Sequence, residues 1–123
     1  MLFDRSQLMR GTLEGCILKI ISRETTYGYE IIEYLRGSGF RDVSEGTIYP
    51  LLLRLEKQNI ISSELRSSPL GPKRKYYTIT DYGRQYLNEF TDCWINLNTA
   101  AAEIIVKEAP HVEQRVEDGS VKT

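Results

Sequence analysis

The sequence predicts a mainly α-helical fold with one β-hairpin, in which three helices come first, the hairpin follows, and one long helix comes last. Two observations predict it. Apolar residues recur at intervals of three and four in four separate stretches, as they do on one face of an amphipathic helix. Between the third and fourth stretches lie two runs suited to β-strands, on either side of a segment that contains Pro and Gly. With 123 residues, the chain has room for one domain and an appendage.

Composition restricts the class of protein. Hydrophobic residues make up 41% and charged residues 27%, which is ordinary for a soluble globular chain. No apolar run approaches the roughly 18 residues of a membrane span. Asp4, Arg5 and Arg10 stand where a signal peptide would need an apolar stretch. We therefore expect a soluble, cytoplasmic protein that does not enter membranes.

The chain lacks the residue sets on which most enzymes depend. Its one histidine, His111, stands in a polar stretch, so a Ser/His/Asp triad and histidine acid–base chemistry lack their parts. Cys16 and Cys93 form no CxxC pair, and each falls within a helical apolar pattern, so we expect buried thiols. No metal-ligand cluster or phosphate-binding glycine loop is recognisable. We expect no enzymatic activity, no cofactor and no metal.

The first two helices are expected over residues 9–23 and from residue 28 to about residue 36. The first has an apolar stripe on one side, formed by Leu13, Cys16, Ile17, Ile20 and Ile21. The second repeats the spacing with Ile31, Ile32 and Leu35. It should stop at the Gly37-Ser38-Gly39 cluster, which supplies flexible or left-handed backbone.

The third helix is expected to begin at Ser44 and to end near Gln58. Either Ser44 is the N-cap or residues 42–45 form a capping box. One face carries Ile48, Leu51, Leu52 and Leu55. Pro50 conflicts with this pattern, because a proline beyond the first turn removes a backbone hydrogen bond. Either the helix starts later or its first turn is distorted.

Residues 60–65 and 74–80 are expected to form the two strands of the hairpin. Residues 67–73 between them are expected to form a long irregular loop, because they contain two prolines and a glycine. Alternation along the second strand places Tyr77 and Ile79 on one face. Arg74, Tyr76 and Thr78 fall on the other. The first face should pack on the helices, and the second should remain in water.

The last helix is expected over residues 81–109, with Thr80 as N-cap and Pro110 as terminator. Its length of roughly 43 Å exceeds what a small domain covers. Apolar residues spaced by three and four follow one side, namely Leu87, Phe90, Trp94, Leu97, Ala101 and Ile104. We interpret residues 81–110 as a dimerisation helix and residues 111–123 as a flexible tail. The alternative is that the stripe packs only on its own domain.

Three helices followed by a hairpin is the element order of a winged helix-turn-helix domain, here residues 1–80, in which the third helix enters the DNA major groove. The charge distribution agrees with this order. The chain has a net charge of −1, yet residues 44–80 hold six basic and three acidic residues. The run Lys73-Arg74-Lys75, beside Tyr76, is expected at the hairpin tip, where it would suit contact with phosphates or a minor groove. The alternative for this run is a solvated turn.

Several motifs resemble those of PadR-type transcriptional regulators. These are residues 44–56 (SEGTIYPLLLRLE), residues 71–80 (GPKRKYYTIT), Gly83, residues 10–13 and residues 27–31. The resemblance covers residues 9–95, and the single long helix after the hairpin resembles the small subfamily. It implies a homodimeric repressor whose long helices pair across a two-fold axis and whose winged helices bind a palindromic operator in double-stranded DNA.

Helical geometry and the family pattern together assign the DNA contacts to the start of the third helix and to the basic run: Ser44, Gly46, Thr47, Tyr49, Pro50, Lys73, Arg74, Lys75 and Tyr76. For the helix-start residues, the alternative is a purely local role at the helix boundary. Arg54 and Glu56 are interpreted as a structural pair. Leu53 stands where family members often carry a polar residue, and either contacts a thymine methyl or is buried.

The segment from Phe90 to Trp94 resembles the one with which small family members hold planar, apolar drugs between tryptophans of the two long helices. A flat indole at a two-fold interface suits stacking of an aromatic ligand. The ligand-binding residues that the resemblance implies are Trp94, Met9, Leu97, Asn98 and Ala101, and a planar hydrophobic effector bound there would release the DNA. The alternative is that Trp94 only anchors the dimer core.

A second function also fits the same fold. A winged-helix protein–protein interaction module would bind DNA without specificity, weakly and with little dependence on salt. It would also tolerate loss of the charges of Lys73, Arg74 and Lys75.

Overall fold

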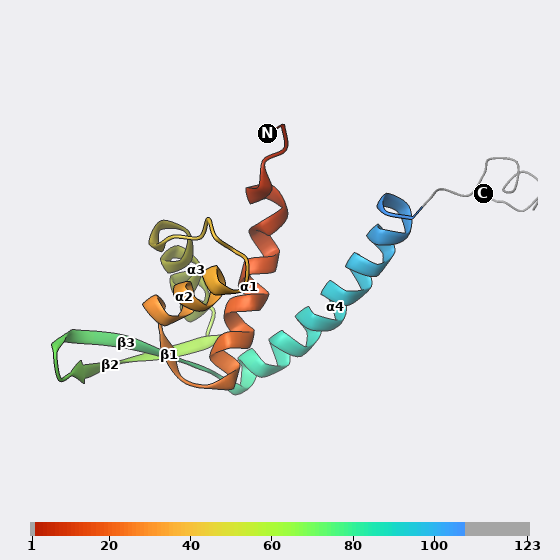
Figure 1. Cartoon of the computed structure of the whole chain (residues 1–123). Coiled ribbons are helices and arrows are strands. Elements are labelled where there is room, and N and C mark those ends of the chain that lie inside the picture. Colours follow the sequence, from red (N-terminus) through yellow and green to blue (C-terminus); the bar gives the residue numbers. More distant parts are fainter. Residues whose placement is uncertain (1, 108–123) are drawn as a thin grey trace, which may run out of the picture. The chain divides into compact units, whose positions relative to one another are not determined.

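The computed structural model describes residues 2–107 of the chain. The element order is α1 (Arg5–Arg23), β1 (Thr26–Tyr27), α2 (Gly28–Gly37), α3 (Glu45–Lys57), β2 (Ile61–Ser68), β3 (Gly71–Ile79) and α4 (Asp81–Ile105) (Figure 1). The predicted order of three helices, a hairpin and a long helix is therefore present. The chain divides into two compact units, residues 1–91 and 92–123. The expected tail over residues 111–123, with His111, lies outside the described residues.

One hydrophobic core holds the first unit together. Its members come from all three N-terminal helices and from the sheet, and include Leu13, Ile17, Ile31, Leu35, Ile48, Leu52, Leu55, Tyr77 and Ile79. The apolar stripes predicted for the helices thus face the core. α1 begins four residues earlier than predicted, because the Asp4 side chain accepts a hydrogen bond from the Ser6 backbone N–H at 3.0 Å and caps the helix.

The sheet has three antiparallel strands in the order β1-β3-β2. Tyr77 and Ile79 of β3 are buried, whereas Arg74 and Thr78 are exposed, as the alternation predicted. β1 was not predicted, because two residues are too few to show a period. It pairs Thr26 with Tyr77 and so attaches the sheet to the start of α2.

The hairpin differs from the prediction of a long loop. β2 extends to Ser68 and β3 begins at Gly71, so residues 69 and 70 alone make the turn. The pairing register shifts between Arg66 and Ser68, and this irregularity accommodates the segment that contains Pro72. The β2–β3 hairpin extends away from the helices as an arm (Figure 1).

α3 keeps Pro50 inside the helix, so the expectation of a later start is wrong. Its first turn is tightened instead, because the backbone N–H groups of Thr47 and Ile48 both donate to the Ser44 carbonyl at 3.0 Å. Ser44 occupies the N-cap position, but its side chain makes no capping hydrogen bond. Because the helix is capped at Ser44 and not at Asp42, the capping box over residues 42–45 is absent.

The start of α4 belongs to the first unit. The predicted N-cap is confirmed, since the Gly83 backbone N–H donates to Thr80 Oγ1 at 2.8 Å. Leu87 lies in the core of its own domain. Phe90 packs against Gly15 of α1, where a Cβ atom would overlap with the aromatic ring. Leu87 and Phe90 thus make contacts within their own chain. The part of the predicted apolar stripe that is exposed in the single chain begins at Trp94.

The second unit, as far as residue 107, consists of the rest of α4. The helix ends at Ile105 and not at Ala109, because the backbone N–H groups of Val106 and Lys107 both donate to the Ala102 carbonyl and close the last turn. Every residue from Thr91 to Lys107 is exposed in the single chain. Cys93 is among them, so the expectation that both thiols are buried is wrong for Cys93. Cys16 is half-buried, and burial raises the pKa of its thiol.

Candidate nucleic-acid interface

The face of α3 opposite the core is open to solvent. Ile48, Leu52 and Leu55 are fully buried, which turns Gly46, Tyr49, Pro50, Leu53 and Lys57 outward. Ser44 and Thr47 at the helix start are also exposed, and their hydroxyl oxygens lie 3.5 Å apart. Leu53 is 49% exposed, so burial is excluded for it.

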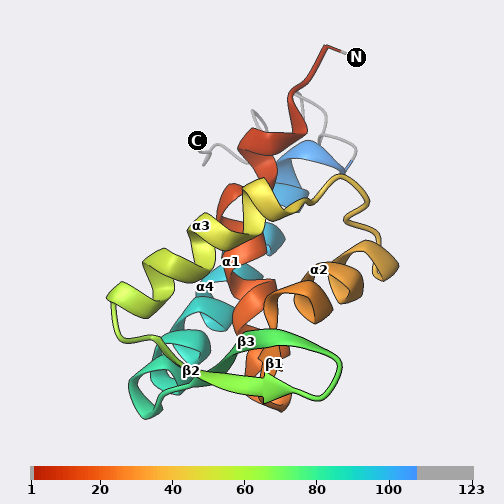
Figure 2. The same cartoon turned by 90° about the vertical axis from the view of Figure 1, so that its left-hand side faces the viewer.

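A groove of about 480 Å³ lies between this face of α3, the start of α2 and the hairpin. Both α3 and the hairpin face the viewer in Figure 2. The residues that line the groove include three cations and no carboxylate: Tyr27, Gly28, Tyr29, Tyr49, Leu53, Lys73, Arg74, Lys75 and Tyr77. The structure thus brings Tyr49, predicted from α3, together with the predicted basic run.

Gly28 explains why α2 and α3 approach so closely here. A Cβ atom at this position would lie 2.5 Å from the Tyr49 hydroxyl oxygen, so only a residue without a side chain leaves room for the tyrosine. The Tyr49 ring therefore rests on the start of α2 and is 41% exposed toward solvent. This contact fixes the position of a predicted DNA-contact residue.

The basic run lies within β3 and not at the tip of a loop, which corrects the prediction. Because side chains alternate along a strand, Lys73 and Lys75 share the sheet face of buried Tyr77, toward α3. Arg74 and Tyr76 share the other face. Within residues 2–107, Lys73 makes no ion pair, whereas Lys75 Nζ lies 2.9 Å from Glu56 Oε1.

Glu56 at the end of α3 is held by two donors. Besides Lys75, it accepts a hydrogen bond from Ser63 Oγ of β2 at 2.6 Å. The Lys75 ammonium first, and then Ser63, hold the pKa of the Glu56 carboxyl below its usual range. The same contact raises the pKa of Lys75. This carboxylate attaches the hairpin to α3 and partly neutralises one of the three predicted phosphate contacts.

The predicted pair between Arg54 and Glu56 is absent. Arg54 instead forms an ion pair with Glu14 of α1, whose side chain is 8% exposed. Glu14 also accepts a hydrogen bond from the Tyr86 hydroxyl of α4 at 2.8 Å, which raises the pKa of Tyr86. A buried carboxylate therefore joins α1, α3 and the start of α4. Sequence reasoning missed Glu14 and Tyr86, because their partners are remote along the chain.

Aromatic and guanidinium groups stack on the outer face of the sheet. The Arg74 guanidinium lies 4.4 Å from the centre of the Tyr27 ring, and that of Arg66 lies 4.9 Å from the centre of the Tyr76 ring. The two tyrosines meet edge to face at 5.3 Å. Such stacking holds the two arginines in place by cation–π attraction while it leaves their charges available. Tyr76, predicted at the DNA contact, thus lies opposite the face that carries Lys73.

The model of one protein family matches residues 17–89, and that family is described as the transcriptional regulator PadR-like family. The chain belongs to this family. PadR-like regulators bind DNA, and the fold with its three-stranded sheet is the PadR-like winged helix. The resemblance inferred from the motifs is confirmed.

Two solved structures are similar to this chain in sequence and fold. A PadR-like transcriptional regulator from Bacillus cereus is 51% identical, with a TM-score of 0.74 over 84% of this chain and 100% of that one. A transcriptional regulator from Streptococcus is 42% identical, with a TM-score of 0.72 over 80% of this chain and 96% of that one.

Two curated relatives are also similar. An uncharacterised protein X of Lysinibacillus sphaericus is 38% identical over 73% of this chain and 84% of its own length. The transcriptional regulator YqjI of Escherichia coli strain K12 is 36% identical over 64% of this chain. The matched part covers 37% of that longer protein.

Two further findings concern membranes and metals. Among residues 2–107, no helix combines the length and apolar character that crossing a bilayer requires. In the same residues, no three side chains of His, Cys, Asp or Glu gather closely enough to bind a metal ion.

The remaining predicted residues lie on α1 and α4. Within α4, Trp94 is 43%, Leu97 64% and Ile104 81% exposed, and Asn98 and Ala101 are exposed beside them. The Asn98 side chain donates a hydrogen bond to the Trp94 carbonyl at 2.8 Å. Met9 belongs to the first unit, where it is half-buried on α1 with its sulfur 3.8 Å from Arg5 Nη2.

Proposed function

We propose that this PadR-like regulator is a cytoplasmic homodimeric repressor that binds a palindromic operator. The first half of α3 enters the major groove of each half-site, and the hairpin lies along neighbouring phosphates. The groove of about 480 Å³ between α3 and the hairpin, which we call the wing groove, carries the proposal. Three cations line it in a chain whose net charge is −1. The contact residues are the predicted ones: Ser44, Gly46, Thr47, Tyr49, Pro50, Lys73, Arg74, Lys75 and Tyr76.

Different residues have different roles in this contact. Thr47 and Tyr49 are exposed at the start of α3 and supply the polar groups for base edges. Lys73 supplies a phosphate contact with no competing carboxylate among residues 2–107. Leu53, exposed in the groove, supplies an apolar contact suited to a thymine methyl.

Fluorescence anisotropy on a labelled duplex from the gene's own upstream region tests DNA binding. With scrambled competitor present, we expect saturable binding and, for a dimer that neutralises about six phosphates, a slope near −5 in log affinity against log salt. Half-sites should be one helical turn or a multiple of it apart. Weak, salt-insensitive binding would instead support the protein-interaction alternative.

Repression is tested separately with a reporter gene behind that upstream region. Expression of the wild-type protein should lower the reporter signal, and a variant with Lys73→Gln should lower it less. An increased signal with the wild type would make the protein an activator.

Homodimerisation is supported by the apolar side chains of α4 that are exposed in the single chain, among them Trp94, Leu97 and Ile104. Burial of such a stripe by a second copy removes apolar surface from water. In sedimentation equilibrium, the wild type should be a dimer and Leu97→Glu a monomer with an unchanged helical signal. Asn96→Glu, which adds the same charge outside the stripe, should remain a dimer.

The proposed effector is a planar, hydrophobic molecule that stacks on Trp94 at the dimer interface, next to Leu97, Asn98 and Ala101. Its support is the 43% exposed indole on the dimerisation helix. Because the chain has one tryptophan, quenching of its fluorescence by a planar hydrophobic dye that does not bind DNA reports on this residue alone. Trp94→Ala should abolish dye binding, measured by dye fluorescence, and the dye should release DNA from the wild type. Unchanged dye affinity in the variant would make Trp94 a structural anchor.

A further inference from the structure

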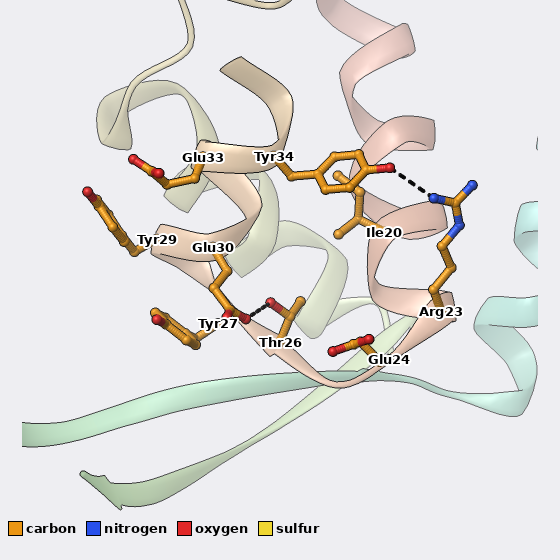
Figure 3. Close-up of a pocket in the computed structure, with 9 residues that line it drawn as sticks. All are labelled: Ile20, Arg23, Glu24, Thr26, Tyr27, Tyr29, Glu30, Glu33 and Tyr34. Atoms are coloured by element: carbon orange, nitrogen blue, oxygen red, sulfur yellow. Dashed lines mark hydrogen bonds between the residues drawn. The ribbon is translucent and has the colours of Figure 1, made fainter. Parts of the chain in front are cut away.

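A second hollow, of about 600 Å³, lies where the end of α1, β1 and α2 meet (Figure 3). It shares Tyr27 and Tyr29 with the wing groove. Its lining has the opposite charge, because it includes Glu24, Glu30 and Glu33 against one cation, Arg23. A hollow with two excess negative charges repels phosphate, so DNA binding does not account for it.

Three tyrosine rings form the aromatic part of this hollow. Tyr29 and Tyr34 of α2 are 53% and 51% exposed. Tyr27 of β1 is half-buried, and Arg74 already covers one face of its ring at 4.4 Å. Figure 3 shows Tyr27 and Tyr29 on one side of the hollow, Tyr34 and Ile20 on the side of Arg23, and Glu30 between them. Aromatic faces together with nearby carboxylates are the combination that attracts organic cations.

The hydrogen bonds in the hollow narrow the class of cation. Glu30 accepts a hydrogen bond from Thr26 Oγ1 at 2.6 Å. The Glu33 carboxylate raises the pKa of the Tyr29 hydroxyl. Because Glu30 already has a donor, a cation that needs no hydrogen bond has an advantage over a primary amine. No metal-binding group of side chains exists in residues 2–107, which disfavours an inorganic cation.

Arg23 does not cancel the attraction for a cation. Its guanidinium donates to the Tyr34 hydroxyl at 3.0 Å, at the edge of the hollow, and forms no ion pair with the three carboxylates. The position of Arg23 keeps its charge off the aromatic faces. Glu24, Glu30 and Glu33 therefore remain negative toward a ligand.

We propose that the hollow bounded by Tyr27, Tyr29 and Tyr34 binds a small quaternary ammonium ligand. The methyl groups of such a cation contact the aromatic faces, and its positive charge is balanced by the surrounding carboxylates. The ligand needs no hydrogen-bond donor, in agreement with the donor that Glu30 already has.

The test uses choline and 3,3-dimethyl-1-butanol, which differ in that a carbon replaces the charged nitrogen. Both are titrated into the ¹⁵N-labelled full-length protein, without DNA, and amide shifts are followed. We expect saturable shifts centred on residues 23–34 with choline, and an affinity at least threefold lower for the alcohol. Equal shifts with both compounds, or none in this segment, would overturn the proposal.

Variants at Tyr34 locate the site. Tyr34→Leu removes one aromatic face and should weaken choline binding about two- to fivefold. Tyr34→Phe keeps the ring but releases Arg23, so it should bind choline more tightly than Tyr34→Leu does. Tyr82→Leu, at an equally exposed tyrosine outside the hollow, is the matched control. Arg23→Gln should strengthen binding, because it removes the one cation. If Tyr34→Leu and Tyr82→Leu have equal effects, choline binds elsewhere and the proposal fails.

Discussion

The ion pair between Lys75 and Glu56 makes a quantitative prediction about the wing. Lys73 and Lys75 lie on the same face of β3, but the ammonium of Lys75 is 2.9 Å from a carboxylate oxygen, whereas Lys73 has no ion pair within residues 2–107. Lys73 should therefore supply a full phosphate contact. The Lys75–Glu56 pair contributes little net charge.

The magnitude follows from counterion release. Each phosphate that is neutralised contributes about 0.9 to the salt slope, so Lys73→Gln in both protomers should reduce the slope by about 1.8 and weaken binding at 0.15 M salt about 30-fold. The double change Lys75→Gln with Glu56→Gln removes a pair with no net charge. It should leave the slope within about 0.5 and the affinity within about threefold of the wild type.

The assay is fluorescence anisotropy on the operator duplex between 0.05 and 0.3 M salt. Lys19→Gln is the matched control, because it makes the same charge change on an exposed residue of α1 that does not line the wing groove. Circular dichroism checks that each variant is folded. A 30-fold loss in the double variant, equal to that of Lys73→Gln, would show that Lys75 binds phosphate with its full charge despite Glu56 and would refute the reasoning.

Three further predictions concern stability. Glu14→Gln should lower the free energy of unfolding in urea by about 1–3 kcal/mol, because two donors lose a buried carboxylate; an unchanged midpoint contradicts this. Gly15→Ala should cost about 1–3 kcal/mol by overlap with Phe90, and adding Phe90→Leu should recover part of it. Glu56 has a lowered pKa, so its stabilising effect is fully present above the ordinary value of 4.5 and is lost as pH falls through the lowered pKa. The difference in unfolding free energy between wild type and Glu56→Gln should therefore shrink steadily as pH falls below 4.5.

Local pattern was sufficient for the elements that carry a clear period. The three- and four-residue spacing of Ile48, Leu52 and Leu55 correctly identified the buried face of α3, and hence the exposed face with Tyr49. Alternation likewise placed Tyr77 and Ile79 inside. Both succeeded because side-chain direction along a helix or strand is a property of the local backbone.

Periodicity could not predict short or irregular elements. β1 has two residues and exists because Thr26 and Tyr27 pair with β3. The hairpin closes in a two-residue turn despite Pro72, because a shift in register accommodates the segment. In both cases pairing with another strand overrides local propensity.

The sequence by itself determined the order of the elements, their inward faces and the concentration of cations after α3, since composition and periodicity are local. Only the tertiary structure decided which charges meet. Arg54 pairs with Glu14, 40 residues away, and not with nearby Glu56, which instead neutralises Lys75. An ion pair depends on where separate elements approach each other, and that approach is set by the packing of the whole core.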